Sequence, residues 1–547
     1  MAQHTETLNI PKTGFAGLRE NLAADLRAGL SISLIALPLS LGIALASGFP
    51  PMAGLIAAII GGMLVSRING SYVTINGPAA GLIVVNLAAI ESLGQGDPQA
   101  GYLYALAAIF VAGILVFLIG AAKAGKLADI FPTSVIHGML AYIGVVIFAK
   151  MIFKMLGAIP EVEKILGSDV LGTIAAIPQG LADMLPSVAI VGGISLLIMA
   201  LHPLIKIKFI QLIPAPLWVL LFAIPAGAAL NLGTLQEQLN LGEGNELLLT
   251  LPGNPLDAVA WVGGFSPDFG KIMSGAFWYA VISIGLVTAI ESALSTKAVD
   301  QIDPYHRHSD ISKDLRGVGA GGAVSGLLGG LPMIAEIVRS KANVLMGART
   351  GWSNFFHGTC ILIFIFALAP VMQMIPISAL AAMMVFVGYK LASPAEFIHT
   401  YKIGRDQLLY FLVTLITCIF TNLLVGVFVG VIFKFFYEWF IIGAPASTLF
   451  VPSLTVDKAS ESEYQVHVKK GAMFTNYLSF KRQLDKLPKG KKIVVDFSEA
   501  KMADFTTQSA LNHYGKLYSE TGGSVELVGL EQLKSYSDHP QSTRYRR

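Results

Sequence analysis

Apolar stretches follow one another almost without interruption from residue 28 to residue 442, and this pattern restricts the chain to a membrane-spanning fold. Each stretch is long enough to cross, or half cross, a hydrocarbon core about 30 Å thick. Only 13% of the 547 residues are charged. We therefore predict an α-helical integral membrane protein. About fourteen segments are expected, near residues 28–48, 51–66, 72–93, 102–122, 132–154, 186–203, 209–231, 274–296, 312–330, 332–346, 355–375, 376–392, 407–424 and 425–442.

The composition changes near both ends of this apolar region. Residues 1–27 contain Glu6, Glu20 and Asp25 and have no apolar core, so we expect a cytoplasmic N-terminal segment rather than a cleaved signal peptide. Residues 452–547 are polar and alternate between strand-like and helix-like patterns, which predicts a small cytosolic α/β domain in the order β-α-β-α-β. The expected transport domain is residues 28–442. A net charge of +3, scattered along the loops, gives no reason to expect nucleic acid as a partner.

Charged residues in the loops predict the orientation. Lys and Arg concentrate in the alternate loops that are cytoplasmic if the N-terminus is cytoplasmic, as the positive-inside rule requires. The loop from about Asn231 to Phe269 contains no Lys or Arg. Its acidic residues are Glu237, Glu243, Glu246, Asp257 and Asp268. An even number of spans then places both termini in the cytoplasm of a multi-pass protein of the cell membrane.

Two of the apolar segments are broken by proline. Asn76–Gly81 and Gly329–Glu336 lie in different halves of the transport domain, and each precedes a short apolar run. Such breaks indicate half-helices whose free N–H groups face a site near the middle of the membrane, and such a site favours an anion. We expect Pro78 in the first helical turn, where its missing N–H costs little. A helix merely kinked at Pro78 is the alternative.

Glu291 stands among apolar residues, which is costly for a carboxylate and typical of an ion pathway. Ser295 lies one turn further along the same expected face. The two residues can hold Na⁺ through oxygen atoms, or Glu291 alone can carry a proton. The alternatives for Glu291 are a buried pair with Arg339 or a helix cap.

Arg339 and Glu336 belong to the second broken segment. Arg339 can add positive charge behind an anion, or it can extend towards the cytoplasm. Glu336 would compete with an anion at a helix start, so we expect either an i, i+3 partner of Arg339 or a residue protonated during transport.

Other motifs give no support for an enzyme. Gly319, Gly321 and Gly322 fit close helix packing better than a phosphate loop. His306 and His308 have no Cys or carboxylate at metal-ligand spacing, and we interpret them as loop residues.

Together these residues resemble the sulfate permease (SulP) family of anion transporters with a C-terminal STAS domain. The similar motifs, in order, are Ala36–Gly48 with Pro50–Leu55, Gly77–Ala80, Ile290–Ser292, Gly329–Ser340 with Asn343, Val495–Ser498 and Asp504–Thr507. Glu336 departs from the small or hydroxylated residue common in the family at that position.

The resemblance implies a homodimer of chains with two inverted seven-segment repeats, divided into core and gate, that moves in an elevator-like way. It implies substrate contacts at Pro78, Ala79, Ala80, Ala335, Glu336, Ile337 and Arg339. It assigns cation or proton coupling to Glu291, Ser295 and Glu336, with Na⁺ at Glu291 and Ser295, and regulation by phosphorylation to Thr506 and Thr507.

The expected function is secondary active transport of bicarbonate or sulfate, coupled to Na⁺ or H⁺ and without any further cofactor. The expected partners are the inorganic anion, membrane lipid and a cytosolic protein that binds the STAS domain. An uncoupled exchanger or anion channel, and a membrane sensor that signals through the STAS domain, are the alternatives.

Overall fold

The computed structural model describes residues 10–125, 131–158, 169–241, 246–251, 266–441, 443, 447, 449–519 and 521–546. The chain divides into two compact units, which are described separately. Unit 1 comprises residues 1–125 and 143–390, and unit 2 comprises residues 126–142 and 391–547. Several residues used to predict the orientation, including Glu243 and Asp257, lie outside the described residues.

Unit 1 is helical, and every apolar window predicted in it contains a helix. Its principal helices are α1 (Gly14–Ala46), α2 (Pro51–Ile60), α4 (Ile83–Gly94), α5 (Pro98–Ala121), α10 (Pro186–Leu201), α12 (Ala215–Ala229), α15 (Gly275–Asp300), α16 (Ile311–Leu327), α17 (Ile337–Leu345), α18 (Trp352–Ala367) and α20 (Ile377–Leu391). Helix α6 (Thr133–Leu156) begins in unit 2 and continues into unit 1.

In the part of the chain that the structure describes, not every predicted window forms a helix that is long enough to span a membrane by itself. Among the described residues, eight helices are long and apolar enough to cross a membrane, and a bent pair gives a ninth. Fourteen separate spans are therefore not confirmed. The shortfall has a physical cause, because several segments are half-helices or short apolar helices, such as Ala80–Gly94 and Trp352–Ala367.

Glycines allow a close contact between two helices of unit 1. A Cβ atom at Gly319 would overlap the backbone of Phe117, and one at Gly113 would overlap the backbone of Ala323. Helices α5 and α16 therefore touch backbone to backbone along this line, as small residues permit in membrane proteins. The interpretation of the glycine-rich segment as a packing surface is confirmed.

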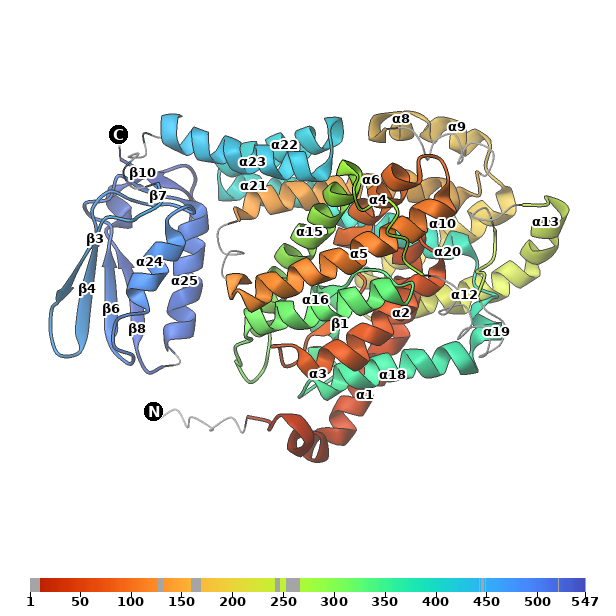
Figure 1. Cartoon of the computed structure of the whole chain (residues 1–547), viewed down its shortest axis with the longest axis horizontal. Coiled ribbons are helices and arrows are strands. Elements are labelled where there is room, and N and C mark those ends of the chain that lie inside the picture. The colour runs from red at the N-terminus through yellow and green to blue at the C-terminus, as the bar shows by residue number, and fades with distance from the viewer. Residues whose placement is uncertain are drawn as a thin grey trace. The chain divides into compact units, whose positions relative to one another are not determined.

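Both proline breaks are extended chain at their centres. Strand β1 (Ile75–Gly77), which is labelled in Figure 1, pairs antiparallel with β2 (Ile334–Glu336), and the two pack among α2, α15 and α17. The 3-10 turn η2 (Ala80–Leu82) and then α4 follow β1, while α17 follows β2 directly. The two breaks predicted from sequence are real, and the kinked-helix alternative at Pro78 is wrong.

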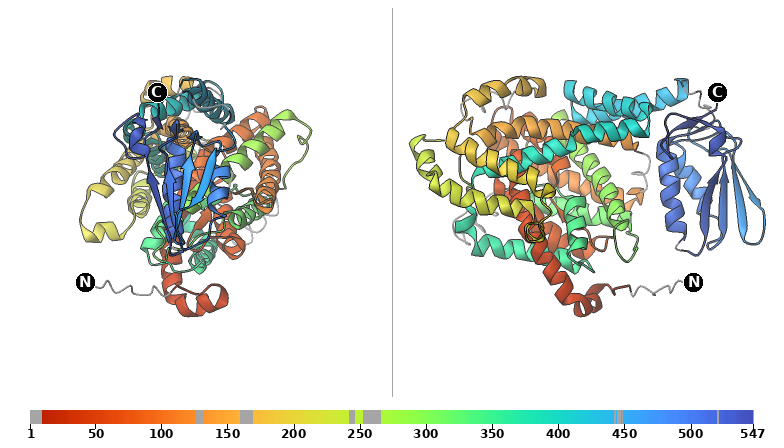
Figure 2. Two further views of the ribbon diagram at one scale, coloured as in Figure 1. Left: turned by 90° about the vertical axis from the view of Figure 1, so that its left-hand side faces the viewer. Right: turned by 180° about the vertical axis from the view of Figure 1, so that it is seen from behind.

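Unit 2 contains helices α21 (Pro394–Ile403), α22 (Arg405–Phe420) and α23 (Leu423–Phe436), followed by the tail. The tail sheet has the order β3-β4-β6-β8, in which β4 (Glu463–Val468), β6 (Lys492–Asp496) and β8 (Ser524–Val528) run parallel. Helices α24 (Tyr477–Leu484) and α25 (Phe505–Ser519) cover one face of this sheet (Figure 2). The predicted β-α-β-α-β order is present, and the antiparallel edge strand β3 (Leu454–Lys458) was missed.

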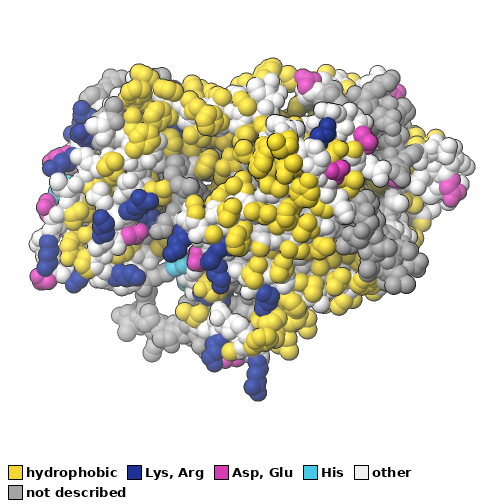
Figure 3. Space-filling model, in the orientation of Figure 1, with side chains coloured by type: hydrophobic (Ala, Val, Ile, Leu, Met, Phe, Trp, Pro, Cys, Tyr) yellow, Lys and Arg dark blue, Asp and Glu magenta, His cyan; other side chains and the backbone are white. Residues whose placement is uncertain are grey.

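The character of the surface differs between the membrane helices and the tail. In the view of Figure 3, hydrophobic side chains cover the helices of unit 1, whereas Lys, Arg, Asp and Glu gather on the tail. Phe117, Leu118 and Leu197 are among the exposed hydrophobic side chains. A contiguous apolar surface of this kind is expected where a protein contacts lipid.

Candidate functional site

The site lies in unit 1, where the two broken segments meet. In the register of the strand pair, Ile75 faces Glu336, Asn76 faces Ala335, and Gly77 faces Ile334. The helices that follow β1 and β2 both begin beside this pair. Because the first N–H groups of a helix lack partners within the helix, two sets of donors are brought to one place.

Hydroxyl groups hold the strand pair in position. The Ala335 N–H donates to Ser292 Oγ of α15 at 3.1 Å, and the Ile75 N–H donates to Ser340 Oγ at 2.9 Å. Ala335 was predicted to contact the substrate through its backbone, but its N–H is already hydrogen-bonded to Ser292. The contribution of Ala335 is therefore structural, because this bond anchors β2 to α15.

Asn76 is the most polar residue of β1 and is fully buried. Its Oδ1 accepts hydrogen bonds from Asn354 Nδ2 at 3.0 Å and from Asn69 Nδ2 at 3.3 Å. Its own Nδ2 group has no partner in the structure. A buried donor without a partner costs about 1–3 kcal/mol, so this amide is a strong candidate for contact with a bound anion.

Arg339 supplies the positive charge at the strand pair. Its side chain is 1% exposed, and its Nε and Nη1 groups have no hydrogen-bond partner among the described residues. A Cβ atom placed on Gly77 would lie 2.9 Å from Nη1, so the guanidinium reaches the end of β1. The cytoplasm-facing alternative for Arg339 is wrong, because the side chain is directed into the protein.

Glu336 has a role that differs from the predicted ion pair. Its Oε2 accepts the backbone N–H of Arg339 at 2.6 Å and so caps the N-terminus of α17. The i, i+3 bond therefore goes to the main chain, since the N3 amide is closer to the cap residue than the guanidinium is. This leaves two of the Arg339 donor groups available.

Glu291 lies against the start of the first half-helix. A Cβ atom at Gly81 would overlap the Glu291 carboxylate, so the group approaches the turn η2 as closely as glycine allows. Oε1 of Glu291 has no partner, and the expected alternative of an ion pair with Arg339 is not recorded among the described residues. A buried carboxylate with a free oxygen is suited to bind a proton or a cation.

A threonine that the sequence analysis did not single out lies on the same helix as Glu291. Thr288 precedes Glu291 by three residues on α15, so the two share a helix face. Thr288 is 5% exposed, and its Oγ1 also lacks a partner. Ser295, four residues after Glu291 on the same helix, is half-buried. Because Na⁺ takes oxygen ligands, Thr288 is a further candidate, beside Ser295, for holding a cation together with Glu291.

The remaining predicted residues differ in burial. Pro78 and Ala79 are buried and extended, and the helical turn begins at Ala80, so the prediction of Pro78 in the first helical turn is wrong. Ala80 is half-buried, whereas Ile337 is 40% exposed. The backbone of Ile337 can still contribute, because it is the first residue of α17.

His357 is a further residue that the sequence analysis did not single out. It lies on α18, is fully buried, and has no partner at either ring nitrogen. Arg339 acts on it electrostatically, which places the two side chains near one another. A single histidine in an apolar helix carries no motif, so only the tertiary structure could associate it with the site.

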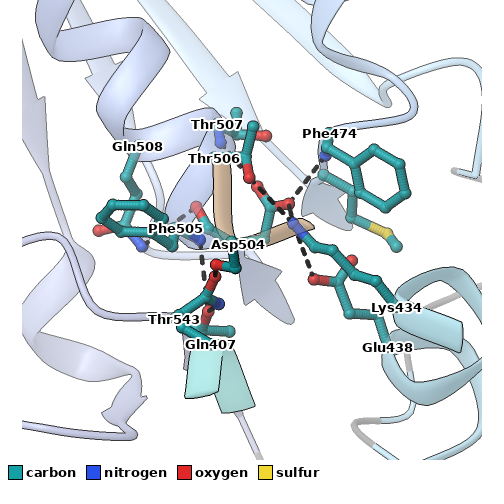
Figure 4. A network of polar contacts seen from close by, with 12 residues as sticks. Gln407, Lys434, Glu438, Phe474, Asp504, Phe505, Thr506, Thr507, Gln508 and Thr543 are labelled. Carbon is teal, nitrogen blue, oxygen red and sulfur yellow. Dashed lines mark hydrogen bonds and ion pairs between the residues drawn. The ribbon is translucent and has the colours of Figure 1, made fainter. Parts of the chain in front are cut away.

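A second polar cluster lies in unit 2 and contains the predicted regulatory residues (Figure 4). Lys434 of α23 is fully buried, and its Nζ donates to Asp504 Oδ2 and to Thr506 Oγ1, each at 3.0 Å. Glu438 lies 3.4 Å from the same ammonium group. Asp504 also accepts the N–H groups of Phe474 and Thr507, at 3.0 and 2.8 Å.

This cluster encloses both threonines. Thr506 is 5% exposed, and Thr507 is fully buried. A kinase therefore reaches the Thr506 hydroxyl only if its contact with Lys434 of α23 first opens. The sequence analysis did not identify Lys434. Its position in an apolar run is nevertheless a usable signal, because a buried lysine needs an acidic or polar partner.

Three comparisons relate the chain to known proteins. The sulfate permease family matches residues 22–414. The putative sulfate transporter YvdB of Bacillus subtilis is 24% identical over 518 residues, which cover 93% of this chain and 91% of YvdB. The bicarbonate transporter BicA of Picosynechococcus is 26% identical over 421 residues, covering 75% of this chain and 69% of BicA.

Solved structures share the fold. The transmembrane domain of a cyanobacterial bicarbonate transporter BicA aligns with a TM-score of 0.59 at 23% identity, over 78% of this chain and 99% of that domain. The murine anion transporter Slc26a9 in its inward-facing state gives 0.62 at 13% identity, over 92% of this chain and 85% of that one. The broken segments, the apolar surface, the STAS-like tail and the family match over most of the length agree: the chain is a multi-pass membrane protein of the sulfate permease family.

Proposed function

We propose that the protein is a secondary active transporter of a small inorganic oxyanion, bicarbonate or sulfate, driven by Na⁺ or H⁺. The observation that carries the proposal is the pairing of β1 with β2, which gathers two helix N-termini and the free donors of Asn76 and Arg339. Similarity to transporters of both anions supports the substrate class. An anion between the two strands would satisfy these donors.

Coupling follows from the position of Glu291. Its carboxylate lies at the same helix start that would bind the anion, and two negative charges there repel. A proton on Glu291, or Na⁺ bound between Glu291 and Thr288, removes this repulsion. The cation and the anion therefore stabilise each other's binding, which is the thermodynamic requirement for cotransport.

The wider proposal concerns assembly and orientation. We propose that residues 28–442 form the transport domain. The N-terminal segment 1–27, which precedes it in the sequence, and the tail 452–547, which follows it, would both lie in the cytoplasm. Within the transport domain we propose two inverted repeats that form a core and a gate, movement of the elevator type, and assembly as a homodimer in lipid. The tail would bind a cytosolic partner.

Uptake into proteoliposomes tests the proposal. Radiolabelled bicarbonate and sulfate should accumulate when a Na⁺ or pH gradient is imposed, and Glu291→Gln should abolish this concentrative uptake while allowing anion binding. Glu237→Gln, at an exposed position of the acidic loop, is the matched control and should transport normally. Concentrative uptake by Glu291→Gln at the wild-type rate would refute the role of Glu291. Channel-like conductance, or no flux of any anion, would refute coupled transport itself.

A further inference from the structure

Two histidines and a glutamate converge at a position in unit 2. His137 lies in the second turn of α6, and Glu396 and His399 lie on α21. One ligand atom from each of the three residues lies within 4.8 Å of the others. His137 Nδ1 is 3.6 Å from Glu396 Oε2, and the rings of His137 and His399 stack with centroids 6.4 Å apart.

Both helices are fixed against the same residue of α22. A Cβ atom at Gly138 would overlap the carbonyl oxygen of Phe411, so α6 contacts α22 at the residue next to His137. Phe397, next to Glu396, packs edge to face against the Phe411 ring at 4.7 Å. The positions of the three side chains therefore depend on close packing rather than on flexible loops.

A hydrogen bond does not account for this arrangement, and an ion pair with Glu396 accounts for only one of the two imidazoles, when His137 is protonated. The 3.6 Å separation is too long for a hydrogen bond between His137 and Glu396. One carboxylate faces two imidazole rings, and two protonated rings at this distance would repel each other. A single divalent ion between the carboxylate and two neutral imidazoles would bind all three groups. It would also avoid the repulsion between two protonated rings.

We propose that His137, Glu396 and His399 form a binding site for a divalent transition metal of the Zn²⁺ type. Two imidazole nitrogens and one carboxylate oxygen are ligands that Zn²⁺ prefers. Tetrahedral ligands about 2.0–2.1 Å from Zn²⁺ lie about 3.3 Å apart. The 3.6 Å pair is already near that spacing, and rotation of the exposed His399 side chain would bring the third ligand in.

The fourth coordination position is left to water. His539 of the tail is the other histidine near this cluster, since His399 acts on it electrostatically. Its Nδ1 accepts the N–H of Gln541 at 3.2 Å, which leaves the proton on Nε2. In this tautomer neither ring nitrogen is free to bind a metal.

Metal binding at this site would join α6 to α21. The three ligands all belong to the unit 2 part of the chain, and α6 continues beyond them into unit 1. The metal site is separate from the proposed anion site, and its ligands take no part in binding the anion.

Titration of the full-length protein with Zn²⁺, purified in detergent with a tag that lacks histidine, tests the site. Calorimetry should show one Zn²⁺ per chain, and Co²⁺ should give the visible absorption of a tetrahedral ion. Affinity should fall more than tenfold in His399→Gln and in Glu396→Gln, whose side chains are partly or fully exposed and should tolerate substitution. His306→Gln removes another exposed histidine and should leave binding unchanged.

Size-exclusion profiles that match the wild type show that each variant is folded. Unchanged Zn²⁺ affinity in His399→Gln, or no saturable binding by the wild type, would overturn the proposal. An equal loss of affinity in His306→Gln would overturn it as well, because it would indicate dispersed surface binding. None of these results depends on transport, so the metal site and the transport function are tested separately.

Discussion

At the scale of single residues, the candidate site is defined by polar atoms that lack partners. Most buried polar groups in proteins are hydrogen-bonded, so exceptions require an explanation. Here the exceptions include Asn76 Nδ2, Arg339 Nε and Nη1 at the strand pair, and Glu291 Oε1 with Thr288 Oγ1 on α15. The first group consists of donors and the second contains acceptors. Free donors at the strand pair are suited to an anion, and free acceptors on α15 are suited to a cation.

Arg339→Met distinguishes a binding role from a structural one. The substitution removes a buried cation whose Nε and Nη1 groups lack partners, so we expect the thermal midpoint in detergent to stay the same or rise. Loss of a charge-assisted hydrogen bond of about 1.5–3 kcal/mol should weaken anion affinity about ten- to a hundredfold. The measurement is the KM for anion uptake together with a melting curve. A large fall in the midpoint with an unchanged KM would assign Arg339 to stability.

At the scale of elements, close contact between segments distant in sequence determines function. Gly81 allows the Glu291 carboxylate to reach the turn before α4, and Gly77 allows the Arg339 guanidinium to reach the end of β1. The proline breaks and the carboxylate on the apolar helix were predictable from sequence. The β1–β2 pairing was not, because three-residue strands without alternation carry no sequence signal.

The buried Lys434 cluster gives a prediction at this scale. In Lys434→Met the carboxylates of Asp504 and Glu438 lose their shared cation, and removal of one partner of a buried pair costs about 3–5 kcal/mol. We expect the tail to loosen from α23, which amide hydrogen exchange of the first turn of α25 should report as faster exchange. Thr506 should also become accessible to a kinase in vitro.

The matched control for this prediction is Lys458→Met, since Lys458 pairs with Glu461 on the exposed surface. That substitution should have almost no effect, because exposed ion pairs contribute little to stability. Equal exchange rates in Lys434→Met and the wild type would show that the cluster does not hold the tail.

At the scale of the whole molecule, the orientation in the membrane can be measured by cysteine labelling. Cys360 and Cys418 are the two native cysteines, and substitution of both gives a background without thiols. Ser266→Cys and Lys489→Cys place one exposed thiol in the acidic loop and one in the tail. An impermeant maleimide should label the first in intact cells and the second only after permeabilisation. Labelling of Lys489→Cys in intact cells would reverse the proposed topology.

The sequence by itself determined the class of protein, because a long series of apolar segments excludes a soluble fold and a polar tail with alternating pattern indicates a separate α/β domain. It also located both breaks and Glu291, since proline and a carboxylate in apolar surroundings are local signals. Only the tertiary structure decided which atoms face one another. Glu336 caps α17 through the N–H of Arg339, Ser292 accepts the N–H of Ala335, and Lys434 donates a hydrogen bond to Thr506. These contacts depend on backbone geometry and on residues far apart in the chain, for which no local pattern exists.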